Sequence, residues 1–241
     1  MQLVYLAALL YFYEMIEFLN TISSKALKVV DENISLKEYT PISISSENKT
    51  LASFDVSSSS EWESFLDEYL KSKKAKVAFG GYIEERDIYK RSAYFNTNDE
   101  EERNIHLGLD LWCNAGTNVL SVLDGEIHSF KNNLNHGDYG PTIIVKHAVE
   151  QKEFYSLYGH LSVESLDHIK VGQRVKQGEV IATLGKSEVN GDYAPHLHFQ
   201  LIIDIENYEG DYPGVTSKKD LDFYKRNCPN PNLLLKLPNE I

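Results

Sequence analysis

Short apolar runs separated by turn residues fill the stretch from residue 104 to residue 205, and this pattern restricts the possible folds more than any other feature. The apolar runs lie at 119–123, 142–145, 154–158, 180–184 and 197–203. Pairs such as Asp124-Gly125, Gly137-Asp138 and Asn190-Gly191 separate them. Evenly spaced short strands with Gly or Asp turns are typical of an antiparallel sandwich or barrel. We therefore predict a mainly β fold, an antiparallel β-sandwich or half-barrel, with a helical extension before it.

One clear helix signature precedes this region. Ser60 is a suitable N-cap, and Glu63 occupies the capping-box position that follows it. Apolar residues then recur at helical spacing and form one face, which comprises Trp62, Phe65, Leu66, Tyr69 and Leu70. The basic run at 71–74 suits a helix C-terminus. We divide the chain into a helix and linker (1–50), a helical and extended flanking segment (51–103), a catalytic domain (104–205) and a tail packed on the body (206–241).

The first residues, MQLVYLAALLYFYEMIEFL, form an apolar run that is too short to span a bilayer as a helix. A secretion signal would begin with basic residues and end at a small-residue cleavage site, and neither is present. We expect an amphipathic helix that docks on the body or on a partner, and we expect no membrane association. A degenerate secretion signal is the alternative.

Charge and cysteine content exclude several classes of function. The 241-residue chain has a formal net charge of −12 and no prominent cluster of Lys and Arg, so we expect no nucleic-acid partner. The two cysteines, Cys113 and Cys228, form no CxxC pair, which excludes a cysteine-rich zinc site. We expect two buried free thiols, and one long-range disulfide is the alternative.

The motif HLGLD places His106 and Asp110 four residues apart. On an extended strand, residues at this spacing lie about 13 Å apart, whereas two ligands of one ion must approach within about 4 Å of each other. The segment must therefore bend if both residues bind one metal ion, and Gly108 between them makes a bend inexpensive. A His and an Asp on an ordinary loop are the alternative.

The motif HLH places His196 and His198 on one face of a strand, so that both imidazoles can serve a single site, while Leu197 points the other way into a core. Pro195 cannot donate to a strand ladder, and we expect the strand to begin here with its first residues at the sheet edge. Two exposed histidines are the alternative. His160, at the end of the strand that begins at Phe154, gains significance only from the other motifs.

These ligand types favour Zn²⁺. One carboxylate and several imidazoles, without a thiolate, suit a zinc ion held by three protein ligands with a fourth position for water. Zinc lowers the pKa of that water towards about 7. No HExxH motif supplies a glutamate as general base. With four histidines and one aspartate available, three ligands leave two imidazoles for proton transfer.

With these motifs, the chain resembles the lysostaphin-type (LytM-like) zinc endopeptidases, a bacterial family that mostly cuts peptide cross-links in peptidoglycan. The resemblance covers about residues 104–205 and rests on the order and spacing of HLGLD, AGTNVLSVLDGEI, DYGPTIIVKH, FYSLYGHLS, IKVGQRVKQGEVIATLG and NGDYAPHLHFQL. The loop at 128–139 is longer than in minimal family domains. The aromatic segment FGGYIEERDIYKRSAYF (79–95) and the later CPNPN lie outside the shared region.

The resemblance implies a role for each of the five residues. His106, Asp110 and His198 correspond to the ligands of one zinc ion per chain, and His160 and His196 correspond to the catalytic histidines. It also implies a peptide substrate, with stem or bridge peptides of peptidoglycan as the usual targets. The compartment stays open between the cytoplasm and, if the substrate is peptidoglycan, the cell envelope.

Two other functions would use the same residues. The domain could be a non-catalytic zinc-holding module that recruits or activates a cell-wall hydrolase, although such a module has no need for His160. It could also be a zinc amidohydrolase that acts on small amides. We further expect the helix with Trp62 and the segment 80–89 to pack beside the groove and narrow it; a plain cap on the sheet is the alternative.

Overall fold

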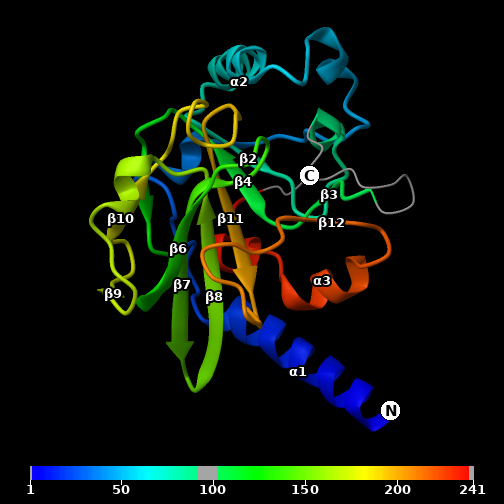
Figure 1. Ribbon diagram of the computed structural model, residues 1–241, viewed down its shortest axis with the longest axis vertical. Coiled ribbons are helices and arrows are strands. Elements are labelled where there is room, and N and C mark those ends of the chain that lie inside the picture. Colours follow the sequence, from blue (N-terminus) through cyan, green and yellow to red (C-terminus); the bar gives the residue numbers. More distant parts are fainter. Residues whose placement is uncertain (1, 92–101, 239–241) are drawn as a thin grey trace.

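A computed structural model of the protein describes residues 2–91 and 102–238, and an eight-stranded sheet lies at its centre (Figure 1). In spatial order the strands are β1 (Tyr39–Pro41), β2 (Val77–Gly80), β4 (Leu109–Trp112), β11 (His196–Ile202), β8 (Lys152–Gly159), β7 (Gly140–Val149), β6 (Gly125–Asn133) and β9 (Arg174–Val175). Neighbouring strands are antiparallel except β1 and β2, which are parallel. The prediction of a mainly β fold is confirmed. The end of the aromatic segment, residues 92–95, lies outside the described residues.

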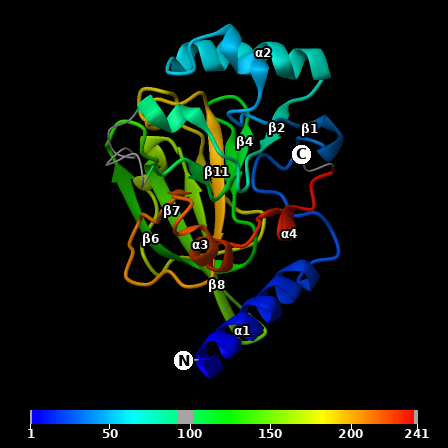
Figure 2. The ribbon, with the colours of Figure 1, turned by 90° about the vertical axis from the view of Figure 1, so that its right-hand side faces the viewer.

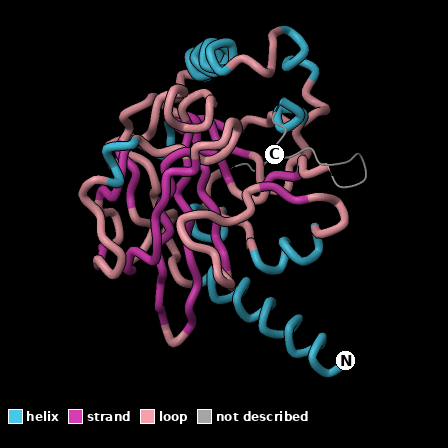
Figure 3. The backbone as a smooth tube through the Cα atoms, viewed as in Figure 1, coloured by secondary structure: helices cyan, strands magenta, loops and turns pink. Residues whose placement is uncertain are grey.

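Within the described residues, two small sheets, four α-helices and several short 3-10 helices surround the central sheet (Figure 3). The small sheets pair β5 (Asn118–Leu120) with β10 (Val180–Thr183), and β3 (Ile105–His106) with β12 (Val215–Thr216). The helices are α1 (Gln2–Thr21), α2 (Ser59–Lys73), α3 (Leu221–Asn227) and α4 (Asn232–Leu235). The flanking segment thus contributes β2 directly to the central sheet, beside the strand that carries Asp110.

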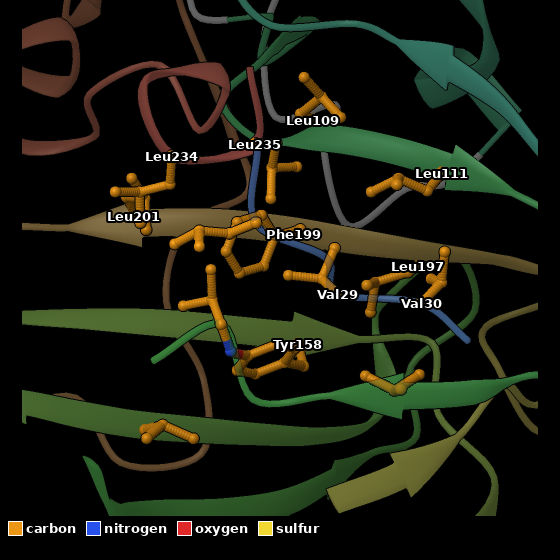
Figure 4. Packing of buried hydrophobic residues seen from close by; sticks show 14 of the residues in the cluster. Val29, Val30, Leu109, Leu111, Tyr158, Leu197, Phe199, Leu201, Leu234 and Leu235 are labelled. Atoms are coloured by element: carbon orange, nitrogen blue, oxygen red, sulfur yellow. The ribbon is translucent and has the colours of Figure 1, made fainter. Parts of the chain in front are cut away.

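The strand alternation separates a core face from a site face. On β11, Leu197, Phe199 and Leu201 are fully buried in the main hydrophobic cluster, together with Leu109 and Leu111 of β4 (Figure 4). This cluster also contains side chains of β5, β10, α1 and α4. Because successive side chains of a strand point to opposite faces, the residues between them on β4 and β11 point to the other face. The candidate site lies there.

Helix α2 lies across one end of the molecule, and α1 lies at the opposite end (Figure 2). The N-cap of α2 is Ser58, whose side chain accepts a hydrogen bond from the Glu61 amide, so the predicted N-cap, Ser60, is wrong by two residues. The acidic Glu61 in the first turn and the basic residues in the last turn complement the helix dipole. The predicted apolar face is confirmed at Trp62 and Leu66, which are buried.

Helix α1 docks through its C-terminal half, where Met15, Phe18 and Leu19 are buried. In the part of the chain that the structure describes, no helix is long and apolar enough to cross a membrane. Cys113 and Cys228 are both buried and free, as predicted.

Candidate metal centre and active-site cleft

Four neighbouring strands bring two of the predicted residues, Asp110 and His198, into one row. In the register of the sheet, Gly80 of β2 lies opposite Asp110 of β4, Asp110 lies opposite His198 of β11, and His198 lies opposite Gly159 of β8. Strand β11 begins at His196, directly after Pro195, as predicted. The expectation that the first residues of this strand lie at the sheet edge holds only in part: β4 and β8 flank β11, but His196 and Leu197 pair with β4 alone, and pairing with β8 begins at His198.

His106 reaches the same place because the chain bends between β3 and β4. His106 lies on β3, which pairs with β12, whereas Asp110 lies on the central sheet. The predicted bend therefore exists, and its glycine has a steric reason. A Cβ atom at Gly108 would lie 2.5 Å from Cε1 and 2.6 Å from Nε2 of His198, so only glycine allows the two segments to approach this closely.

Three electron-rich atoms converge at this point. Nε2 of His106 and Nδ1 of His198 are 2.8 Å apart, and each lies 3.3 Å from Oδ1 of Asp110. All three side chains are buried. His106, Asp110 and His198 form a candidate metal site among the described residues.

The hydrogen bonds behind the two rings fix which nitrogens are free to bind a metal. Nδ1 of His106 lies 2.8 Å from the carbonyl of Gly81, which can only accept, so this nitrogen carries the proton. Nε2 of His198 lies 2.9 Å from Oε1 of Gln200. Because the Gln200 amide nitrogen donates to the Pro213 carbonyl, Oε1 is the acceptor that faces His198. Both remaining nitrogens therefore present lone pairs to Asp110.

Electrostatics keep His106 neutral and Asp110 ionised, which are the forms that bind a metal ion. Burial lowers the pKa of His106 to about 4, so the ring is neutral at physiological pH. Burial alone would raise the pKa of the Asp110 carboxyl, but the charges around it, that of the Arg86 guanidinium among them, outweigh burial and hold that pKa well below its usual range. Oδ1 of Asp110 is a buried oxygen without a hydrogen-bond donor.

The donor set therefore fits a zinc ion. Ligand distances of about 2.0–2.1 Å place the donor atoms of a tetrahedral zinc ion roughly 3.3 Å apart. The two distances to Oδ1 of Asp110 match this spacing, and a small separation of the two imidazoles would accommodate the third. Lone pairs of two neutral rings and one carboxylate repel one another unless a cation lies between them.

His160 and His196 lie beside this cluster with a shared orientation. Nδ1 of His160 donates to the carbonyl of Asn190, and Nδ1 of His196 donates to that of Ala194, both at 2.7 Å. The two ring centroids are 4.3 Å apart. Burial lowers the pKa of both imidazoles. Each ring therefore keeps Nε2 as a free proton acceptor.

The backbone of His160 is in the left-handed region, with φ of 63°. A non-glycine residue adopts this conformation only where its surroundings enforce it. Two backbone hydrogen bonds do so here, because the His160 amide donates to the Tyr139 carbonyl and the Gly185 amide donates to the His160 carbonyl. The turn re-aims the imidazole from the end of β8 towards the HLH motif.

The side chains of the three candidate ligands and of His160 and His196 line a cleft of about 170 Å³. The flanking segment supplies part of its wall, through Trp62, Ile88 and Tyr89, and Ile44 adds to it. The expectation that Trp62 and the segment 80–89 lie beside the groove is therefore confirmed. Trp112 continues this wall and stacks on His196, with ring centroids 5.8 Å apart. Asp138 and Asp211 lie elsewhere in the lining.

Sequence reasoning missed three residues that support the cluster. Gln200 could have been found, because it follows His198 by two residues and therefore points to the same face. Gly81 and Arg86 could not have been found in this way. They come from a segment without a metal-binding pattern, and only the pairing of β2 with β4 brings that segment to Asp110.

We expect Gly108→Ala to lower the affinity for zinc by about 10- to 100-fold, the range for a disturbed ligand support. The added methyl group would displace the His198 ring, which Gln200 holds from behind. Competition with a chromophoric chelator measures the affinity. Gly116→Asn is the matched control, because the space around that position is open and Asn tolerates its positive φ. An unchanged affinity in Gly108→Ala would refute the steric role of this glycine.

The part of the chain that carries this site is similar to a known protein family. Residues 104–209 match the description "Peptidase family M23". The chain is 37% identical over 94 residues to "Cell division protein DipM" of Caulobacter vibrioides. The aligned region covers 39% of this chain and 14% of that protein. The chain is also 35% identical over 95 residues to "Glycyl-glycine endopeptidase ALE-1" of Staphylococcus capitis. This aligned region covers 39% of this chain and 24% of that protein.

A further relative is "Peptidoglycan DD-endopeptidase ShyC" of Vibrio cholerae, at 31% identity over 99 residues, 41% of this chain and 20% of that protein. The chain thus spans a quarter or less of the length of these three relatives. Among solved structures, the catalytic domain of lysostaphin from Staphylococcus simulans is 25% identical, with a TM-score of 0.35, and covers 51% of this chain and 80% of that one.

Proposed function

Because residues 104–209 match peptidase family M23, we propose that this chain is a zinc-dependent endopeptidase that hydrolyses peptide cross-links of peptidoglycan. In this proposal His106, Asp110 and His198 hold one zinc ion, and His160 and His196 transfer protons. The convergence of the three donor atoms carries the proposal, since two proton-free ring nitrogens and Oδ1 of Asp110 point at one position.

The histidine pair accounts for the proton movements of amide hydrolysis. Both Nε2 atoms are unprotonated in the resting cleft, because both Nδ1 protons are committed to backbone carbonyls. One ring accepts the proton of the attacking water, and a protonated ring can then donate to the leaving amine. The carbonyls of Asn190 and Ala194 hold the two rings in place and accept the Nδ1–H bond in both protonation states.

A bound zinc ion supplies Lewis acidity, which lowers the pKa of water towards about 7 and polarises the scissile carbonyl. The residues of the chain orient the ligands, transfer protons and form the walls of the cleft. Arg86 and Gln200 orient ligands, and burial lowers the pKa of His160 and His196, which keeps both imidazoles neutral and able to accept a proton. The aromatic wall with Trp62 and Trp112 excludes water from one side of the cleft.

The names of two relatives support a cross-link peptide as the substrate. One relative is named as a glycyl-glycine endopeptidase and another as a peptidoglycan DD-endopeptidase. Both names describe the hydrolysis of a peptide bond, which is also the reaction that the proposed site suits. We therefore expect an extended peptide, and not a small amide, to occupy the cleft.

We expect the zinc-loaded protein to release defined peptide fragments from purified peptidoglycan and from either glycine-rich or DD-linked model peptides. Mass spectrometry of the digests identifies the bond that is cut. Small amides should be turned over at least about 100-fold more slowly, because they lack the flanking contacts that position a peptide.

The same panel separates the alternatives. Preferred hydrolysis of small amides would indicate an amidohydrolase. Zinc binding without hydrolysis of any substrate would indicate a module that recruits or activates another cell-wall enzyme. Either result would refute the proposed endopeptidase, and removal of the metal with a chelator provides the blank for every digest.

A further inference from the structure

Arg86 is a buried cation in contact with a proposed metal ligand. Its side chain is 3% exposed, and Nη1 lies 2.6 Å from Oδ2 of Asp110. Its guanidinium also lies over the ring of Trp112, 5.8 Å from the centroid. A positive charge directly beside a cation site opposes metal binding by Coulomb repulsion. A buried arginine at this position must therefore offset that repulsion by another effect on the site.

The two oxygens of Asp110 have different surroundings. Oδ2 accepts the hydrogen bond from Arg86, whereas Oδ1 has no donor and faces the nitrogens of His106 and His198. A zinc ion can bind a carboxylate through one oxygen or through both. With Oδ2 engaged by a charged donor, only Oδ1 is available.

Glu84 holds Arg86 in this position and neutralises it. Oε2 of Glu84 lies 2.7 Å from Nε of Arg86. The other oxygen of Glu84 accepts from the hydroxyl of Ser43 at 2.7 Å and from the amide of Ile44 at 3.0 Å. The guanidinium thus bridges two carboxylates, and the repulsion of the metal by Arg86 is reduced accordingly.

The same short segment supports the second ligand. Gly81 accepts from Nδ1 of His106, and a Cβ atom at Gly81 would lie 1.8 Å from Nη2 of Arg86. Gly81, Glu84 and Arg86 therefore form one packed unit behind His106 and Asp110. All three lie outside residues 104–209, the part of the chain that matches the family.

We infer that Arg86 is a positioning residue that keeps Asp110 a one-oxygen metal ligand, with Glu84 holding the guanidinium in place. The flanking segment thereby completes the metal centre of the matched domain. This inference rests on the proposed zinc site. Loss of Arg86 leaves Oδ2 buried without a donor, which is unfavourable, so this oxygen turns to the metal and raises its coordination number.

Cobalt substitution measures this directly, because four-coordinate Co²⁺ absorbs visible light several-fold more strongly than five- or six-coordinate Co²⁺. We expect the full chain to show the strong spectrum and Arg86→Met to lose most of it. Turnover of the zinc-loaded variant should fall about 10- to 100-fold with KM unchanged, the range for a lost ligand partner.

Two further variants make the result decisive. Arg86→Met leaves the charge of the Glu84 carboxylate without its cationic partner. The double variant Arg86→Met/Glu84→Gln removes that charge. It should show the same loss of cobalt absorption and a wild-type circular dichroism spectrum. Arg103→Met is the matched control, since Arg103 also lines the cleft but donates to the Val215 carbonyl. Its cobalt spectrum should equal that of the wild type.

A folded double variant with the wild-type cobalt spectrum would overturn this inference and leave the zinc site intact. Equal spectral loss in Arg103→Met would also overturn it, because any cleft arginine would then suffice. Failure of the wild-type chain to bind cobalt or zinc would instead overturn the proposed metal centre, and this inference with it.

Discussion

Substitution of His198 by alanine is expected to lower the affinity for zinc more than about 100-fold, beyond the range seen when only a supporting residue is removed. His198 supplies one of the three converging donor atoms, and it lies at the centre of the row formed by β2, β4, β11 and β8. Its loss would leave two donors for the ion. Metal analysis after dialysis, together with chelator competition, measures the effect.

Asp110→Asn tests the second ligand with less disturbance than Asp110→Ala. The amide keeps an oxygen that can accept from Arg86, so that the buried guanidinium is not left without this partner. We expect a comparable loss of zinc. Gln177→Asn, on an exposed turn, serves as the control and should retain one zinc ion per chain. Wild-type occupancy in either ligand variant would contradict the assignment of His198 or Asp110.

The second large effect concerns turnover without metal loss. We expect His160→Asn and His196→Ala to keep zinc affinity within about threefold and to lose roughly 10²–10⁴-fold in kcat/KM, the usual contribution of an acid–base group. Asn is chosen at position 160 because it tolerates the left-handed backbone there. In both variants the three donor atoms of the metal site are unchanged.

Peptide hydrolysis and zinc content must be measured on the same preparations. His196 is the more informative position, since its Nε2 lies 3.9 Å from Oδ1 of Asp110, close to the donor cluster. Loss of zinc from His196→Ala as complete as from His198→Ala would make His196 a ligand. Full turnover in either variant would exclude that imidazole from proton transfer.

Local patterns in the sequence were sufficient for the fold class and for the set of five residues. Period-two alternation depends only on the geometry of a single strand, so it predicted that Leu197 faces the core while His196 and His198 share the other face. An extended HLGLD segment separates its ends by about 13 Å, which is too far for two ligands of one ion. A bend was therefore required between His106 and Asp110, and β3 and β4 are indeed separate strands.

Tertiary structure alone decided how the site is supported. The hydrogen bond from His106 to Gly81 and the ion pair between Arg86 and Asp110 join residues 24 or 25 positions apart, across the pairing of β2 with β4. Such contacts depend on strand order and register, which no local spacing encodes. The sequence by itself therefore predicted which residues gather in the candidate site. The packing of the flanking segment against the sheet determined which oxygen of Asp110 and which nitrogen of His106 face the candidate metal site.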